Sequence, residues 1–122
     1  MGAPLLSIAM PTRNRAQLFE RALGSVIGAA ATVADDVEVT VSDGSDDDAT
    51  GQVVERLLAD WPGGYQYVHN RPMLPLVDNM NRAAELASGA WIMQLDDDDY
   101  LLPGAGAAMI DAIRRVGPMN RS

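Results

Sequence analysis

The 122-residue sequence contains no cysteine and no lysine. The absence of cysteine excludes disulfide bonds and thiolate metal sites, and it leaves the cellular compartment undetermined. The sequence also lacks an apolar run of the ~18 residues that a membrane-spanning helix needs. Its first residues show no charged stretch followed by an apolar one, so no signal peptide is visible. A cytoplasmic location is therefore our default expectation.

Positive charge is scarce and comes from arginine alone. Nine arginines oppose 17 acidic residues, which gives a formal net charge of −8. Because no basic stripe is present to neutralise phosphates, we expect no nucleic-acid partner. Eight of the acids lie in two short runs, and the remaining nine balance the arginines. The excess negative charge is thus confined to Asp43 with residues 46–48, and to residues 96–99.

The apolar content of 48% is typical of one globular domain with its own core. We predict a domain over residues 1–117 and an unstructured tail over residues 118–122. Strands and helices are predicted to alternate, which indicates an α/β fold with a mainly parallel sheet. The strands are expected at residues 5–10, 37–42, 65–69 and 91–95, and the helices near residues 18–27, 49–60, 76–88 and 103–116.

Three local signals predict where helices begin and end. Asn14 and Gln17 have the spacing of a capping box before the first helix. Gly89 suits the C-terminal cap of the third helix. Pro103 is able to occupy the first position of the last helix.

Residues 91–95, which read WIMQL, predict a buried parallel strand with Trp91 in the core. Four consecutive aspartates follow this strand. Ionised carboxylates that leave water need a partner or a metal. In an extended segment side chains alternate, so Asp96 and Asp98 are expected on one side and Asp97 and Asp99 on the other.

Polar segments follow three of the predicted strands directly, at residues 11–14, 43–48 and 96–99. In open parallel sheets ligands bind outside the carboxyl ends of the strands, so we expect these segments to line one rim. Mg²⁺ and Mn²⁺ prefer carboxylate oxygens. Residues 96–99 therefore favour a metal site over a solvated turn that caps the next helix.

Single residues on this rim allow more than one interpretation. The Asp43 carboxylate ends a strand at a glycine turn and is able to accept hydrogen bonds from a base or a ribose. Arg13 is either a surface residue or a contact to phosphate or a base. A calcium loop starting at Asp46 is excluded because its twelfth position is Leu57 instead of glutamate. Neither the P-loop nor the dinucleotide-binding fingerprint occurs, and His69 is interpreted as structural.

Four ordered motifs that cover nearly the whole chain resemble family 2 glycosyltransferases of the GT-A fold. The resemblance implies the Rossmann-like, nucleotide-sugar-binding half of that fold, with about four strands and helices on both faces. It also implies a UDP-, GDP- or dTDP-sugar as ligand. The motifs are MPTRN at residues 10–14, VSDGSDD at 41–47, NMNRA at 79–83, and ASGAWI with LDDDD within 87–99.

The resemblance also implies roles for individual residues. Asp43 matches the acid that holds the base, although Ser42 replaces an aspartate often seen beside it. Asp98 and Asp96 match the DXD motif as ligands of Mn²⁺ or Mg²⁺, with Asp98 the foremost of the two. The residues implied to contact the nucleotide sugar are Pro11, Thr12, Arg13, Asp43, Asp96 and Asp97.

The implied reaction is inverting glycosyl transfer, in which a carboxylate base activates the acceptor hydroxyl. The half of the family's fold that supplies this base and the acceptor site is not found here. The catalytic residues therefore stay unassigned, and we expect a donor-binding half without turnover of its own. A sheet shortened in this way leaves an unpaired edge, which predicts self-association.

Two other functions remain as alternatives. The first is a domain that binds nucleotide without transferring sugar, which is consistent with the missing half. The second is a Mg²⁺-binding receiver-type signalling module. Such a module resembles a different arrangement, with an acidic pair after the first strand and a lysine after the last, and this sequence has neither.

Overall fold

The computed structural model describes residues 3–116 and contains a four-stranded sheet, all parallel, in the order β3-β2-β1-β4. The predicted α/β class is confirmed. The predicted tail and residue 117 lie outside the described residues. The strands are β1 (Leu6–Thr12), β2 (Val37–Asp43), β3 (Tyr65–His69) and β4 (Trp91–Gln94).

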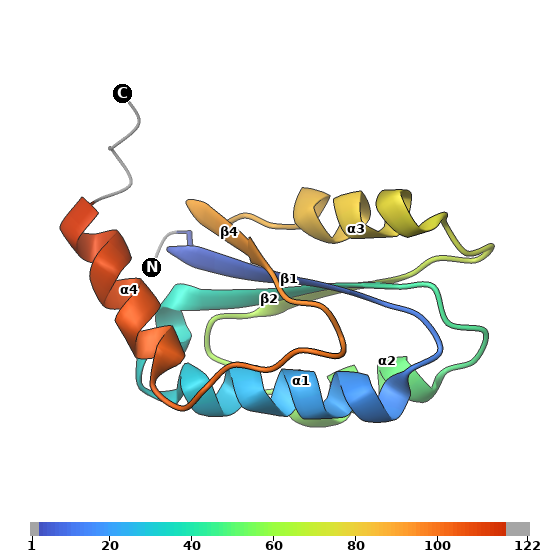
Figure 1. The fold of residues 1–122 in the computed structure, drawn as a ribbon, viewed down its shortest axis with the longest axis horizontal. Coiled ribbons are helices and arrows are strands. Elements are labelled where there is room, and N and C mark those ends of the chain that lie inside the picture. Colours follow the sequence, from blue (N-terminus) through green and yellow to red (C-terminus); the bar gives the residue numbers. More distant parts are fainter. Residues whose placement is uncertain (1–2, 117–122) are drawn as a thin grey trace.

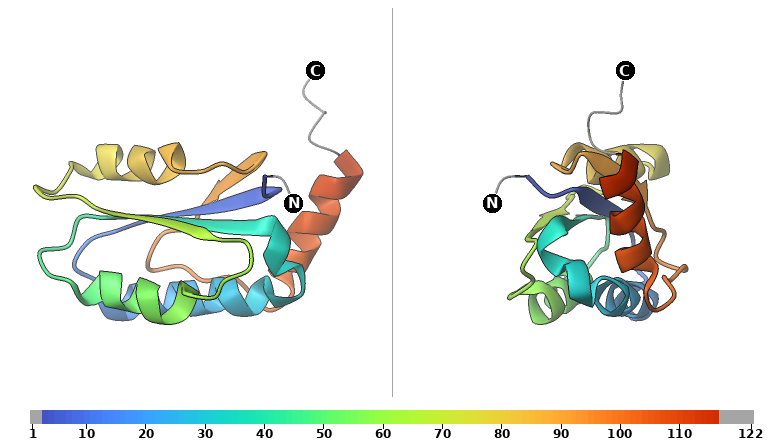
Figure 2. Two further views of the ribbon diagram at one scale, coloured as in Figure 1. Left: turned by 180° about the vertical axis from the view of Figure 1, so that it is seen from behind. Right: turned by 90° about the vertical axis from the view of Figure 1, so that its left-hand side faces the viewer.

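Helices cover both faces of the sheet, as expected. Helices α1 and α2 lie on one face and α3 lies on the other (Figure 1). Helix α4 packs against α1 and the short helix η1 at one end of the molecule (Figure 2). None of the described helices is long and apolar enough to cross a membrane. The helices are α1 (Ala16–Ala29), η1 (Ala31–Asp36), α2 (Ala49–Leu58), α3 (Leu76–Glu85) and α4 (Ala105–Val116).

The core lies mainly between the two central strands and α1. Strands β1 and β2 are buried along their whole length. Ile8 and Met10 from β1 join Val39 from β2, and Phe19 and Leu23 from α1, in one apolar cluster. Each such side chain stabilises the fold by ~1.5–3 kcal/mol when it is removed from water. The central strands are thereby fixed, and with them the rim at their carboxyl ends.

Strand β4 lies at one edge of the sheet, a position that the sequence did not indicate. Among the described residues, only β1 pairs with it. Trp91 is 41% exposed and Ile92 is 52% exposed, so the prediction of a buried strand with Trp91 in the core is wrong. Leu95, at the end of the apolar run, is buried. The composition of the run indicated a strand correctly, but strand order decided its burial.

The three predicted helix signals are also wrong. Arg15 is the N-cap of α1 and makes no capping bond, while Asn14 has a left-handed backbone with φ of 54°. The Asn14 side chain bonds to Asp46 in the next loop instead. Helix α3 ends at Glu85, before Gly89, and α4 begins at Ala105, after Pro103. Tertiary contacts therefore override the local signals here.

Candidate functional site

The carboxyl ends of the strands meet at one rim, as the topology predicted. Strand β1 continues through Pro11 to Thr12, two residues further than expected, and Thr12 stands in register with Asp43 on β2. The aspartates of residues 96–99 follow β4 after one residue, Leu95. The Thr12 hydroxyl donates a hydrogen bond of 2.8 Å to Asp97. Segments distant in the sequence are thus in direct contact at the rim.

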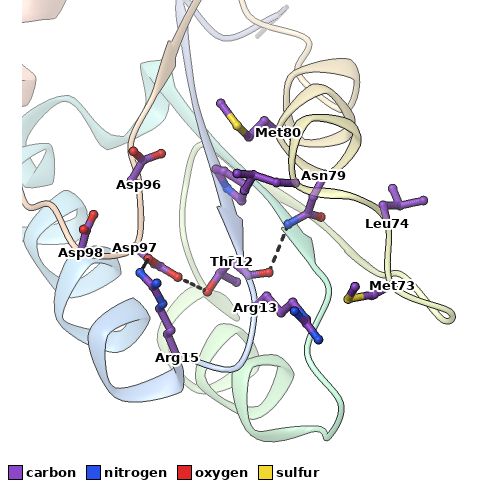
Figure 3. Close-up of a pocket in the computed structure, with 12 residues that line it drawn as sticks. Thr12, Arg13, Arg15, Met73, Leu74, Asn79, Met80, Asp96, Asp97 and Asp98 are labelled. Carbon is purple, nitrogen blue, oxygen red and sulfur yellow. Dashed lines mark hydrogen bonds and ion pairs between the residues drawn. The ribbon is translucent and has the colours of Figure 1, made fainter.

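A cleft of about 420 Å³ lies between this rim and α3 (Figure 3). One wall carries the aspartates and arginines, and the opposite wall is mainly apolar. Six of the seven predicted site residues line it, and Asp43 does not. The lining residues are Pro11, Thr12, Arg13, Arg15, Met73, Leu74, Leu76, Asn79, Met80, Asp96, Asp97 and Asp98.

A second hollow of about 450 Å³ adjoins the first, because both are lined by Arg13 and Met73. We call the two hollows together the groove. The groove runs from the aspartates after β4 across the ends of β1 and β2 to the loop after β3. The second hollow is lined by Arg13, Gly44, Ser45, Asp46, Asn70, Arg71, Pro72 and Met73.

Two loops of the groove are held together by Asn14. Its side-chain amide donates to the Asp46 carboxylate at 3.1 Å, and its amide oxygen accepts the Asp46 N–H at 2.8 Å. The Asn14 N–H also donates to the Ser45 hydroxyl at 2.8 Å. The left-handed conformation that allows these bonds is one that asparagine tolerates better than most residues. The wall around Arg13 is therefore fixed before any ligand binds.

Residues 96–99 form a tight turn, which we call the acidic turn. The Asp99 N–H donates to the Asp96 carbonyl at 3.1 Å, so the chain folds back on itself. One carboxylate oxygen from each of Asp96, Asp98 and Asp99 lies within 4.8 Å of the others, and all three residues are exposed. The expectation that Asp97 and Asp99 lie on the same side of the segment is wrong. The segment is a turn instead of an extended strand, and the Asp99 carboxylate lies beside those of Asp96 and Asp98.

The chemistry of the acidic turn fits a hard divalent cation. Three carboxylates this close repel one another, and a cation among them reverses that repulsion. Mg²⁺ and Mn²⁺ take carboxylate oxygens and fill their other positions with water or phosphate. The oxygens of Asp96, Asp98 and Asp99 are the donor set that the described residues offer for this.

Asp97 points toward Thr12 and Arg15, whereas Asp96 and Asp98 point elsewhere (Figure 3). It is only 7% exposed, and each of its oxygens has a partner. One oxygen accepts from the Thr12 hydroxyl at 2.8 Å, and the other pairs with the Arg15 guanidinium at 3.3 Å. Asp97 therefore joins the acidic turn to the end of β1 and to the start of α1.

Asp43 is completely buried beneath the groove. One oxygen accepts the Ser45 N–H at 2.8 Å, and the other accepts the Tyr67 hydroxyl at 2.7 Å. Burial of the phenol raises the pKa of Tyr67, and the hydrogen bond to the Asp43 carboxylate raises it further. The role of Asp43 as a contact to the base stays a prediction.

Asn79 is a site residue that the sequence reasoning missed. It is buried, it lines the cleft, and its amide donates to the Thr12 carbonyl at 3.2 Å. Its amide oxygen accepts from Ser42 at 2.7 Å and from Asn70 at 3.1 Å. Residue 79 stands four positions before the inward-facing Ala83, and this spacing is the signal that would have identified it.

Together, a parallel α/β sheet and a groove at the carboxyl ends of its strands define a Rossmann-like domain, a class in which ligands bind at that rim. The chain matches the sequence model of the family described as "Glycosyl transferase family 2" over residues 7–118. It therefore belongs to this family, as the motifs indicated.

Two relatives among the curated proteins are bacterial glycosyltransferases. The chain is 35% identical over 102 residues to the GalNAc(5)-diNAcBac-PP-undecaprenol beta-1,3-glucosyltransferase of Campylobacter jejuni, which covers 84% of the chain and 32% of that protein. The chain is also 31% identical over 112 residues to a PGL/p-HBAD biosynthesis glycosyltransferase of Mycobacterium bovis. That alignment covers 92% of this chain and 42% of the relative. The chain thus spans 32% to 42% of the length of these two relatives.

Solved structures show the same fold. The mannosyltransferase PcManGT from Pyrobaculum calidifontis, in complex with GDP-Man and Mn²⁺, superposes with a TM-score of 0.74 at 23% identity. The match covers 96% of this chain and 33% of that one. TarS from S. aureus gives a TM-score of 0.71 at 23% identity, covering 90% of this chain and 19% of TarS.

Proposed function

We propose that this domain binds the nucleotide-diphosphate sugar donor of an inverting, metal-dependent glycosyltransferase in its groove. The observation that carries the proposal is the position of the acidic turn. It shares one cleft with Thr12 and Arg13 in a member of glycosyltransferase family 2. A cleft with two faces of this kind suits a ligand that joins a nucleoside to a diphosphate.

In this proposal the nucleoside lies along the end of β1. Pro11, Thr12 and Arg13 line the cleft there, and Arg13 also lines the second hollow. A guanidinium is able to stack on a base or to pair with a phosphate. Arg13 is therefore placed where the nucleoside and the diphosphate of one bound donor meet.

Asp98 and Asp96 hold the divalent cation, and Asp96 also lies within reach of a ribose. The exposed acidic turn alone repels a diphosphate. When bound, Mn²⁺ or Mg²⁺ supplies the positive charge that neutralises the diphosphate and stabilises it as a leaving group. The mannosyltransferase of the same fold, in complex with GDP-Man and Mn²⁺, supports this assignment.

The test is calorimetry of the chain against UDP, GDP and dTDP, each with Mn²⁺, with Mg²⁺ and with chelator. We expect binding of at least one nucleotide only when the metal is present. Asp98→Ala is expected to weaken this binding about tenfold or more, because the cation loses one of its few anionic ligands.

Asp111→Ala is the matched control. Asp111 is an exposed aspartate of α4 that pairs with Arg115 at 2.6 Å and does not line the groove. This variant is expected to bind nucleotide as the unchanged chain does. Equally tight binding with and without metal would contradict the assignment of the acidic turn.

A further inference from the structure

We propose that Asp97 is a positioning residue that fixes the acidic turn, and that it contacts neither the cation nor the sugar donor. This inference rests on the proposed function, because it concerns how the metal-binding carboxylates are held. It assigns the second aspartate of the run a role different from that of its three neighbours.

The first argument is the burial and pairing of the carboxylate. Asp97 is 7% exposed, whereas Asp96, Asp98 and Asp99 are all exposed. Its oxygens already pair with Thr12 at 2.8 Å and with Arg15 at 3.3 Å. Only 7% of Asp97 is exposed, so little of the carboxylate is open to a ligand beside the two protein groups that already hold it.

The second argument is that Asp97 links the acidic turn itself to another element, whereas the main-chain bonds flank the turn. The turn follows β4, the exposed edge strand, and it concentrates three like charges within 4.8 Å. Main-chain groups are bonded on both sides of the turn, from Leu95 to Ala9 and from Leu101 to the Ser25 hydroxyl. Within the described part of the chain, Asp97 is the one side chain of the turn bonded to an element other than β4.

The third argument is that the anchor point itself is rigid. The Thr12 carbonyl accepts the Gly44 N–H at 2.9 Å and the Asn79 amide at 3.2 Å. Thr12 is buried at the end of the central strand β1. Through Asp97, the position of the acidic turn is therefore tied to the end of the central strand β1 as well as to the edge strand β4.

The experiment measures Mn²⁺ affinity by electron paramagnetic resonance of the free ion, with Mn²⁺ alone and with GDP added. The variants are Asp97→Ala, Thr12→Val and the double variant. Residues that orient metal ligands typically contribute ~10–100-fold to metal affinity. We expect each single variant to weaken Mn²⁺ binding about tenfold. The double variant is expected to bind Mn²⁺ as tightly as the single variant with the lower affinity, because both changes break the same link.

Other patterns overturn the inference. If Asp97 were itself a ligand, Asp97→Ala would lose Mn²⁺ while Thr12→Val bound it normally. If its role were only structural, the melting temperature would fall while Mn²⁺ affinity stayed the same. Additive losses in the double variant would also contradict a shared link.

Further variants keep these outcomes interpretable. Asp97→Asn retains an acceptor for the Thr12 hydroxyl and loses the charge that faces Arg15, so we expect an intermediate affinity in a well-folded protein. Asp111→Ala removes an aspartate that pairs with arginine outside the groove and is expected to bind Mn²⁺ normally. Mn²⁺ binding that Asp98→Ala leaves intact would overturn the proposed metal site. If Asp98→Ala lost Mn²⁺ binding while the Asp97 variants kept it, only the inference about Asp97 would be overturned.

Discussion

At the scale of the residue, the groove is held by side chains that bond to one another. Tyr67 is the clearest case, because its hydroxyl reaches the Asp43 carboxylate at 2.7 Å beneath the groove. Asp43 in turn holds the Ser45 N–H, and the His69 ring bonds to the Ser45 carbonyl at 2.7 Å. Residues of β3 thus hold the loop after β2 in place. A substitution at Tyr67 is therefore expected to alter the stability of that loop.

Tyr67→Phe tests this support through its pH dependence. Removing the hydroxyl is expected to reduce stability by about 1–2 kcal/mol at neutral pH, because Asp43 loses a charge-assisted hydrogen bond. Burial raises the pKa of Tyr67 in the folded state above the value of ~10 for a free phenol. The contribution of the phenol to stability is therefore complete below pH ~10 and declines as the pH rises further.

The measurement is urea unfolding of both proteins between about pH 7 and pH 11. The stability difference between wild type and Tyr67→Phe is expected to be constant up to about pH 10 and to narrow above it. The other titrating groups are the same in both proteins and cancel in this comparison. A difference that widened in alkaline solution would contradict the arrangement.

At the scale of the element, replacement of glycine by alanine is expected to change stability in opposite directions at two helical positions. Gly24 lies in the middle of α1, where an added Cβ meets nothing within 4 Å, so Gly24→Ala is expected to stabilise by about 0.5–1 kcal/mol. Gly106 lies in α4 against the end of α1, and its Cβ would stand 2.6 Å from the Ala29 carbonyl oxygen. Gly106→Ala is expected to destabilise by about 1–3 kcal/mol.

Thermal or urea unfolding of the two variants measures this prediction directly. The two substitutions are identical in chemistry, so they control for one another. Equal effects of the same sign would show that the packing of α4 on α1 is not as tight as the close approach at Gly106 requires.

The sequence predicted the elements well and their arrangement less well. Strand β3 was placed correctly at both ends, and all four principal helices were found. Such predictions succeed because apolar periodicity is a local property of the chain. Strand order is not local, so the run WIMQL at residues 91–95 gave no sign that β4 is an edge strand. The acidic turn was expected to be extended for a similar reason, since its conformation depends on the contact between Asp97 and Thr12 of β1.

The candidate site was predictable to the extent that topology determined it. The rule that ligands bind at the carboxyl ends of parallel strands placed Thr12 and Asp98 in one cleft correctly. It did not distinguish exposed carboxylates from buried ones. Asp43 and Asp97 differ from Asp98 in the partners that their side chains find, and those partners come from other strands and loops.

At the scale of the whole molecule, β4 has no strand on its outer side among residues 3–116. Its residues, WIMQ, include no charge and no proline, which are the usual protections of an edge strand. Trp91 and Ile92 present apolar surface beside it. We propose that two copies of this chain associate through this edge.

Sedimentation equilibrium over a range of concentrations checks this proposal. We expect the apparent mass to rise with concentration, and Ile92→Lys to remain monomeric because a charge on the edge opposes pairing. Val116→Lys, which places the same charge at an exposed aliphatic residue of α4, is the control and is expected to associate like the unchanged chain. A monomer at every concentration would contradict the proposal.

Strand β4 also connects the cleft, where the ligand is proposed to bind, with the outer edge of the sheet, where a second copy is proposed to pair. Only Leu95 separates β4 from the acidic turn, so a contact that restrains this strand also restrains the carboxylates that follow it. Thermodynamic coupling of this kind is reciprocal. On the two proposals made above, binding in the cleft and pairing of two copies through the edge are expected to favour each other, so the affinity for the ligand is expected to rise with protein concentration.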